Sequence, residues 1–180
     1  MSKVLAIDTS TSRTSVAIID GDSILFSGFR DGATAHGPSL PALVQEALAI
    51  SDVDEVVVGM GPGPFTGLRV GIAFAQSFAL ARDIPVRGVC SLDAIAAQIN
   101  EKDFIVTVDA RRKEVYWARY KDGVRVGEPA VNFPADVTGA AIHADLFPDM
   151  QALVQLPGNI TEPIYLRRPD AVATADRPHY

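Results

Sequence analysis

The order of apolar segments along the first hundred residues restricts the fold more than any other feature of the chain. Three β-rich apolar runs come first, at 4–7, 14–19 and 24–29, with short breaks between them. The break Asp20-Gly21-Asp22 is a tight-turn signal, so the three runs predict an antiparallel meander. Apolar residues at helical spacing then alternate with short strands. The predicted order is β-β-β-α-β-α-β-α, with helices at 39–50, at 67–82 and from residue 91, and strands at 56–58 and 86–89.

This order is that of a ribonuclease-H-like lobe, and two such lobes make up the actin, Hsp70 and sugar-kinase architecture. A second β-rich block follows the polar stretch 100–103, with apolar runs at 104–109, 115–120 and 124–126. We therefore predict an α/β protein with an N-terminal ribonuclease-H-like lobe, residues 1–100, and a smaller, shortened second lobe, residues 101–180. A short helix is expected at 136–143.

Local signals place the helix starts. Ser39 is the expected N-cap of the first helix, and Pro41 then falls in the first turn, where a missing N–H costs little. Ser91 is the expected cap of the third helix, with Asp93 in a position that the helix dipole favours.

Composition narrows the class of protein. The 180 residues carry a net charge of −6 and a pI near 5.0, which disfavours strong independent binding of RNA or DNA and leaves binding within a complex open. The lone Cys90 cannot form an internal disulfide, and such a thiol fits a reducing compartment. There is no secretory signal pattern at the N-terminus and no uncharged stretch long enough to span a bilayer. We expect a soluble cytoplasmic protein with no membrane partner.

Phosphate in this architecture sits in a turn of each lobe that resembles Asp-x-Gly-Thr, because glycine lets backbone N–H groups approach an anion. The first turn, after Asp8, has Ser10 in place of the glycine. The second turn, after Asp109, has Arg111 there and no glycine at all. We expect both to be degraded phosphate turns. Asp8 and Asp109 would face each other across an interlobe cleft, where paired acids could do acid–base work, although structural use at strand ends is favoured.

Other signatures of chemistry are absent from the sequence. The segment 59–67 matches neither Gly-x-Gly-x-x-Gly nor a P-loop, and Pro62 and Pro64 lack the amide donors that a phosphate needs. No histidine stands at metal-ligand spacing, and there is no Gly-x-Ser-x-Gly elbow. We expect no catalytic residue, no metal and no cofactor bound by this chain alone.

The helices point instead to a partner. The helix 67–82 is apolar nearly all round, so its own sheet cannot cover every side. Glycine inside a helix costs about 1 kcal/mol relative to alanine, which indicates a packing reason for Gly71. Arg69 opposes the helix dipole in the first turn and is expected to pair with an acid of this chain or of a partner. The predicted interface comprises Leu40, Leu43, Val44, Ala47, Gly67, Arg69, Val70, Gly71, Phe74 and Phe78.

Four segments then carry a resemblance to a known family. They read VLAIDTS (4–10), GPGPFTGLRVG (61–71), DARRKEVY (109–116) and PIYLR (163–167), and they resemble the TsaB (YeaZ) family. The second segment is highly specific and the apolar runs are not. The second lobe is shorter than in a typical family member, and residues 133–160 show little recognisable pattern.

The resemblance implies a non-catalytic subunit in the synthesis of threonylcarbamoyladenosine next to the tRNA anticodon. Members pair with the paralogue TsaD through N-terminal lobe helices, and the ATPase TsaE docks on that pair. TsaD holds a metal with His-x-x-x-His, and the aligned positions in this chain are Ser91 and Ile95, which do not suit a metal. Contact with tRNA would come only through the complex.

Two other functions remain as alternatives. One is an active nucleotide-dependent transferase of the actin-like fold, and the other, less favoured, is a peptidase. A homodimer through the same helices is a further alternative when TsaD is absent, because exposed apolar helices seek cover.

Overall fold

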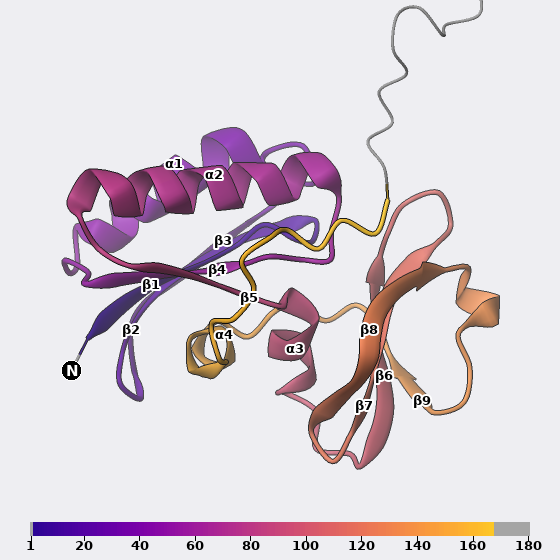
Figure 1. Ribbon diagram of the computed structural model, residues 1–180. Coiled ribbons are helices and arrows are strands. Elements are labelled where there is room, and N and C mark those ends of the chain that lie inside the picture. The colour runs from indigo at the N-terminus through magenta and orange to yellow at the C-terminus, as the bar shows by residue number, and fades with distance from the viewer. Residues whose placement is uncertain (1, 168–180) are drawn as a thin grey trace, which may run out of the picture.

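The computed structural model describes residues 2–167, which form two sheets (Figure 1). The first sheet has the strand order β3-β2-β1-β4-β5, with an antiparallel meander followed by two parallel strands. This is the predicted topology, and the α/β actin-like fold is confirmed. Its strands are β1 (Lys3–Asp8), β2 (Arg13–Asp20), β3 (Ser23–Asp31), β4 (Glu55–Gly59) and β5 (Val86–Val89).

Helices cover both faces of this sheet. α1 (His36–Leu48) and α2 (Phe65–Arg82) lie on one face, and the short α3 (Ser91–Ala96) and α4 (Met150–Gln155) lie toward the other (Figure 1). Because side chains alternate along a strand, each face receives its own core cluster. Leu5 and Ile7 of β1 pack toward α1 and α2, whereas Val4 and Ala6 pack toward α4.

The second sheet has the order β8-β7-β6-β9. α3 packs against it, with Leu92 and Ile95 in one cluster with Phe104 and Tyr120. The expected helix at 136–143 is wrong: Gly139 takes a positive φ of 103°, which interrupts a helix, and residues 141–143 pair in parallel with β6. The elements are β6 (Asp103–Asp109), β7 (Val115–Lys121), β8 (Val124–Asn132), the 3₁₀ turn η1 (Pro134–Asp136) and β9 (Ala141–His143).

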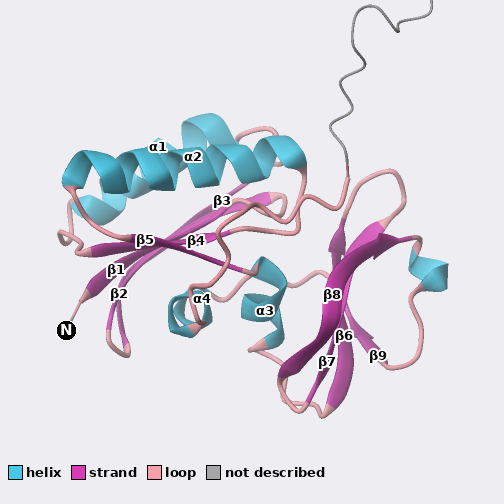
Figure 2. Cartoon of the chain, viewed as in Figure 1, coloured by secondary structure: helices cyan, strands magenta, loops and turns pink. Residues whose placement is uncertain are grey.

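The chain crosses back between the two sheets near its end. All strands of the first sheet precede residue 100 and all strands of the second follow it (Figure 2). α4, however, returns to the first sheet, where Leu153 is fully buried beside Ala17 and Ile19 of β2. Arg87 of β5 holds this segment through hydrogen bonds to the carbonyls of Val154 and Leu156. The second half of the chain thus contributes one helix to the first lobe.

The predicted start of the first helix and both predicted serine caps are wrong. α1 begins at His36, so Ser39 is not its N-cap and Pro41 lies inside the helix. α3 begins at Ser91, whose side chain does not cap the helix because its hydroxyl bonds elsewhere. Among residues 2–167, no helix has both the length and the apolar character needed to cross a membrane.

Candidate functional site

The turn after β1, the first expected phosphate turn, lies inside the protein. Asp8, Thr9 and Ser10 are each 1% exposed. The backbone N–H of Ser10 donates to Asp8 Oδ1 at 2.9 Å, and the Ser10 hydroxyl donates to the same oxygen at 2.7 Å. The Thr9 hydroxyl donates to the carbonyl of Gly67 at 2.8 Å. These donors, which would have to approach a phosphate, are therefore already used within the chain.

Glycines at the start of α2 close over this turn. A Cβ on Gly63 would stand 2.4 Å from the Ser10 carbonyl oxygen, and one on Gly67 would stand 2.8 Å from that of Thr9. A Cβ on Gly71 would stand 2.3 Å from Thr9 Oγ1. These distances lie far inside van der Waals contact. The small-residue line of α2 therefore lets this chain's own first turn approach, which explains the glycines without a partner.

A buried hydrogen-bond network surrounds the Asp8 carboxylate. The Ser91 hydroxyl donates to Asp8 Oδ2 at 2.6 Å and accepts the N–H of Gly61 at 3.2 Å. A Cβ on Gly59 would come within 1.9 Å of the same Oδ2. Burial raises the pKa of Asp8, while the bonds from Ser91 and Ser10 counteract that rise. Ser91, the position aligned with a TsaD metal ligand, thus serves as an internal hydrogen-bond donor, and residues 2–167 hold no metal-binding group of His, Cys, Asp and Glu side chains.

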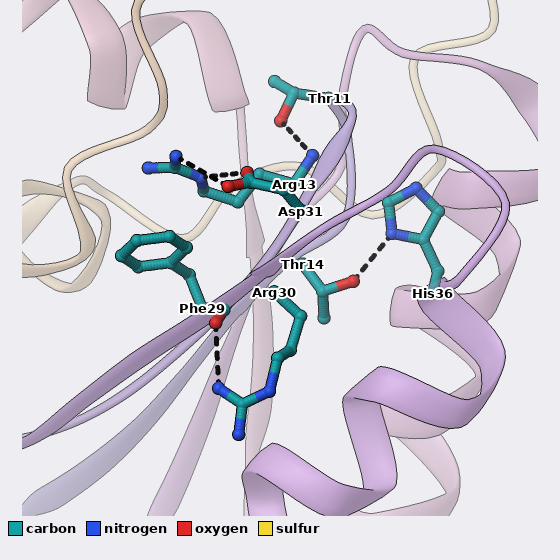
Figure 3. A network of polar contacts seen from close by, with 7 residues as sticks. All are labelled: Thr11, Arg13, Thr14, Phe29, Arg30, Asp31 and His36. Carbon is teal, nitrogen blue, oxygen red and sulfur yellow. Dashed lines mark hydrogen bonds and ion pairs between the residues drawn. The ribbon is translucent and has the colours of Figure 1, made fainter.

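His36 belongs to the same closed region and was missed as a site residue. It is 5% exposed, and its Nδ1 is 2.8 Å from the Thr14 hydroxyl (Figure 3). Burial lowers the pKa of His36, Asp8 counteracts this lowering, and Arg111 adds to it. In the sequence, His36-Gly37-Pro38 is typical of a loop, and only the proline, favoured in a first helical turn, could have placed His36 at the helix start.

The second expected phosphate turn has a different structure. Asp109 is exposed and accepts the N–H of Arg111 at 2.9 Å. Arg111, Arg112 and Lys113 all take positive φ, between 54° and 64°. Arg111 also reaches the first lobe, where it donates to the carbonyl of Ala33 at 3.4 Å. A hollow of about 100 Å³ between the lobes is lined by Asp109 and Arg111 but not by Asp8. The two acids therefore do not face each other.

Most of the predicted interface residues are core residues of this chain. All six are buried, and the four on α1 are at most 3% exposed, so they offer no surface to a partner. The reason is that α1 turns its apolar stripe inward onto β2 and α2 turns its glycines onto the first turn. This correction applies to Leu40, Leu43, Val44, Ala47, Gly67 and Gly71.

The four remaining predicted residues lie nearer the surface. Val70, Phe74 and Phe78 are half-buried and pack against the core cluster under α1 and α2. Arg69 is exposed, and its guanidinium lies 4.7 Å from the centre of the Phe65 ring. No acid of residues 2–167 forms an ion pair with Arg69, so an acid of a partner stays the prediction.

The exposed stripe of α2 consists, apart from Arg69, of residues that were not predicted from the sequence as interface residues. They recur at helical spacing along the outer side of the helix, and Leu80, at 84%, is the most exposed large apolar side chain of residues 2–167. Apart from Arg69 the stripe is uncharged. Its members are Thr66, Arg69, Ala73, Gln76, Ser77 and Leu80.

Comparison with known proteins identifies the family. A family model described as "TsaD: tRNA N6-adenosine threonylcarbamoyltransferase" matches residues 31–169. This chain belongs to the TsaD/YeaZ (TsaB) family. A YeaZ structure from Pseudomonas aeruginosa superimposes with a TM-score of 0.73 at 28% identity, covering 86% of this chain and 90% of that one.

Sequence relatives in the TsaD/YeaZ family differ in length. An uncharacterized protein of Mycobacterium tuberculosis is 44% identical, over 95% of this chain and 94% of its own length. The tRNA threonylcarbamoyladenosine biosynthesis protein TsaB of Escherichia coli is 35% identical over 70% of this chain, which spans 59% of that relative. The chain therefore matches nearly the whole length of the mycobacterial relative but less than two thirds of TsaB.

Proposed function

We propose that this chain is a non-catalytic subunit that pairs with TsaD in the cytoplasm and, with TsaE, supports threonylcarbamoyl transfer to the adenosine next to the tRNA anticodon. The observation that carries the proposal is the closed first turn. Its donors are consumed by Asp8 and Gly67, and the glycines of α2 leave no space at it for a phosphate.

The outer side of α2 supports the pairing. In its stripe from Thr66 to Leu80, the small side chains Ala73 and Ser77 let another helix come close, and Leu80 supplies one large exposed apolar side chain. On α1, Pro41, Ala42 and Gln45 are exposed and uncharged, and the acid Glu46 follows them. Interface cores are depleted in charged residues, and the stripe of α2 carries one charge, that of Arg69. We propose this outer surface of α1 and α2, with Arg69, Val70, Phe74 and Phe78 at its border, as the TsaD interface.

The test is reconstitution. The reaction mixture contains TsaD, TsaE, tRNA, ATP and threonylcarbamoyl-adenylate. Threonylcarbamoyladenosine in the tRNA is measured with and without this chain. We expect modification only in the complete mixture and none from the chain alone. Equal yield without the chain would overturn the proposal.

A matched pair of variants ties the activity to the surface. Ala73→Asp places a charge on the outer stripe, and Thr138→Asp places one at an exposed position of the second lobe. We expect the first to lose modification and the second to retain it, with unchanged unfolding in both.

The alternative of an active nucleotide-dependent transferase makes a separate demand. It requires Mg-ATP to bind the isolated chain, and calorimetry measures this directly. Saturable binding that Arg111→Ala abolishes would favour this alternative. The occupied donors of Ser10 argue against such binding at the first turn.

A further inference from the structure

Three of the four segments that carry the family resemblance meet at one place on the surface. Phe65, the first residue of α2, packs on Tyr165 with the two ring centres 4.8 Å apart. Arg167 then donates to the carbonyl of Ala110 at 2.9 Å. The segment 163–167 therefore connects the start of α2 to the turn between β6 and β7 (Figure 1).

The aromatic part of this place is a supported and accessible tyrosine. Tyr165 is 39% exposed, although its ring packs on the half-buried Phe65. The guanidinium of Arg69 lies 4.7 Å from the centre of the Phe65 ring, so α2 also holds that ring. An aromatic ring that is fixed and partly exposed offers a surface on which a nucleobase can stack.

The cationic part is the turn 111–113, which reads Arg-Arg-Lys. All three residues are exposed, and all three take left-handed φ angles between 54° and 64°. Side chains other than glycine rarely adopt this conformation in succession, and strained backbone of this kind is concentrated at binding sites. Of the two acids beside the turn, Glu114 forms an ion pair with Arg167, and Asp109 accepts the N–H of Arg111. The turn therefore concentrates positive charge on a chain whose net charge is −6.

An aromatic surface beside a cluster of cations is the combination that binds unpaired nucleic acid, because bases stack on the ring and phosphates pair with the cations. In an RNA duplex the bases are already stacked, so none is available to Tyr165. An acidic protein segment would use the cations and leave Tyr165 without a role. Unpaired RNA is the ligand that uses both parts of the site.

We propose that Tyr165 and the turn 111–113 form a contact site for unpaired RNA, in which one base stacks on Tyr165 and the neighbouring phosphates lie against Arg112 and Lys113. The inference rests on the proposed function, because a chain with a net charge of −6 binds RNA weakly by itself and the contact adds to those that TsaD makes. Arg69 contacts Phe65 and lies at the border of the proposed TsaD interface. The RNA therefore touches both subunits.

The test measures binding of a fluorescently labelled anticodon stem–loop RNA to the preassembled complex of this chain with TsaD, by anisotropy. Adenosine monophosphate has a base and a phosphate but no strand, and it is the competing probe. We expect the RNA to bind the complex and the monophosphate to displace it only far above the Kd of the RNA. Displacement at concentrations near that Kd would assign the site to a free nucleotide and overturn the proposal.

Variants of Tyr165 test the stacking. Tyr165→Ala should weaken RNA binding about tenfold, and Tyr165→Phe, which keeps the ring, should bind like the wild type. Val124→Ala shortens a side chain that is 68% exposed at the other end of the β7–β8 hairpin, and it should have no effect. Unchanged binding by Tyr165→Ala, or an equal loss with Val124→Ala, would overturn the proposal.

A second pair of variants tests the phosphate contact. Lys113→Asn removes one cation at a left-handed position that asparagine tolerates. The slope of the logarithm of the binding constant against that of the salt concentration should become shallower by about 0.7, the value for one phosphate of a single strand. Lys102→Asn removes an exposed cation at the other end of β6 and should leave the slope unchanged. Equal changes in the two variants would mean attraction to net charge alone and would overturn the proposal.

Calorimetric titration with TsaD separates this site from the proposed function. All the variants should bind TsaD like the wild type, since none lies on the outer side of α2. Failure of the wild-type chain to bind TsaD would overturn the proposed function. A normal complex that binds RNA equally well with Tyr165→Ala and with Lys113→Asn would overturn the RNA contact alone, and loss of TsaD binding in Tyr165→Ala would assign Tyr165 to the protein interface instead.

Discussion

The inner and outer sides of α2 have similar small residues and opposite environments. On the inner side Gly67 and Gly71 press against Thr9 of the first turn. On the outer side Ala73 and Ser77 are exposed, with Leu80 at the end of the same stripe. A line of small residues on a helix therefore indicates that another segment packs closely against it, but does not show which segment. Here one line closes the turn after β1, and we propose that the other receives a partner.

The largest expected effect contrasts leucine on the two sides. Gly71→Leu forces a side chain into Thr9 and should lower the free energy of unfolding by about 3 kcal/mol, because the turn is backed by the sheet. Ala73→Leu points outward and should change it by less than about 0.5 kcal/mol. Urea unfolding of both variants gives the comparison. Similar losses in the two would show that the sides do not differ as described.

The second prediction concerns the network under the inner side. Ser91→Ala removes the donor to Asp8 Oδ2 and the acceptor of the Gly61 N–H, and it should cost about 2 kcal/mol of unfolding free energy. Ser77→Ala, on the outer side of α2, is the matched control and should be nearly neutral. If Ser91→Ala were equally neutral in thermal or urea unfolding, the buried carboxylate would not depend on this bond.

The smallest expected effect is a pH dependence from His36. Its pKa is lowered in the folded state by burial, so the unfolded chain binds the proton more readily and stability falls as pH drops below about 6.5, the ordinary histidine value. Asp8 has a raised pKa and contributes with the opposite sign, since protonation relieves its burial. The difference between the wild-type chain and His36→Asn isolates the histidine.

Unfolding followed from pH 7.5 to 5 measures that difference. The wild type should lose more stability than His36→Asn over this range. Parallel profiles would mean that His36 is protonated as readily in the folded chain as in the unfolded one.

The sequence predicts the topology well, because alternation and turn signals are local. The meander, the two parallel strands and the start of the second sheet were all predicted from apolar runs and from Asp20-Gly21-Asp22. The start of α1 was not predicted, since Ser39 has the chemistry of a cap but lies within the helix, where the chain continues from His36. The preference of serine for an N-cap position is overridden there by the contact of His36 with Thr14.

The candidate surface was harder to predict than the fold. Leu40 and Leu43 satisfy helical spacing whether their stripe faces the sheet or a partner, so periodicity alone cannot decide. Position 71 needs a glycine because Thr9 packs against it. Thr9 lies 62 positions earlier in the chain, and only the folded structure brings the two together. Ser10 in place of glycine predicts a degraded first turn, but the closure of that turn by α2 could not be predicted from the sequence.

The central claim is that the outer side of α2 binds TsaD, and calorimetric titration of TsaD with the double variant Ala73→Asp/Leu80→Asp tests it most directly. Both positions are exposed, so urea unfolding should match that of the wild type, while burying two unpaired acids in the interface should weaken binding at least tenfold. Unchanged affinity in a normally folded variant would contradict the claim and move the interface to another surface.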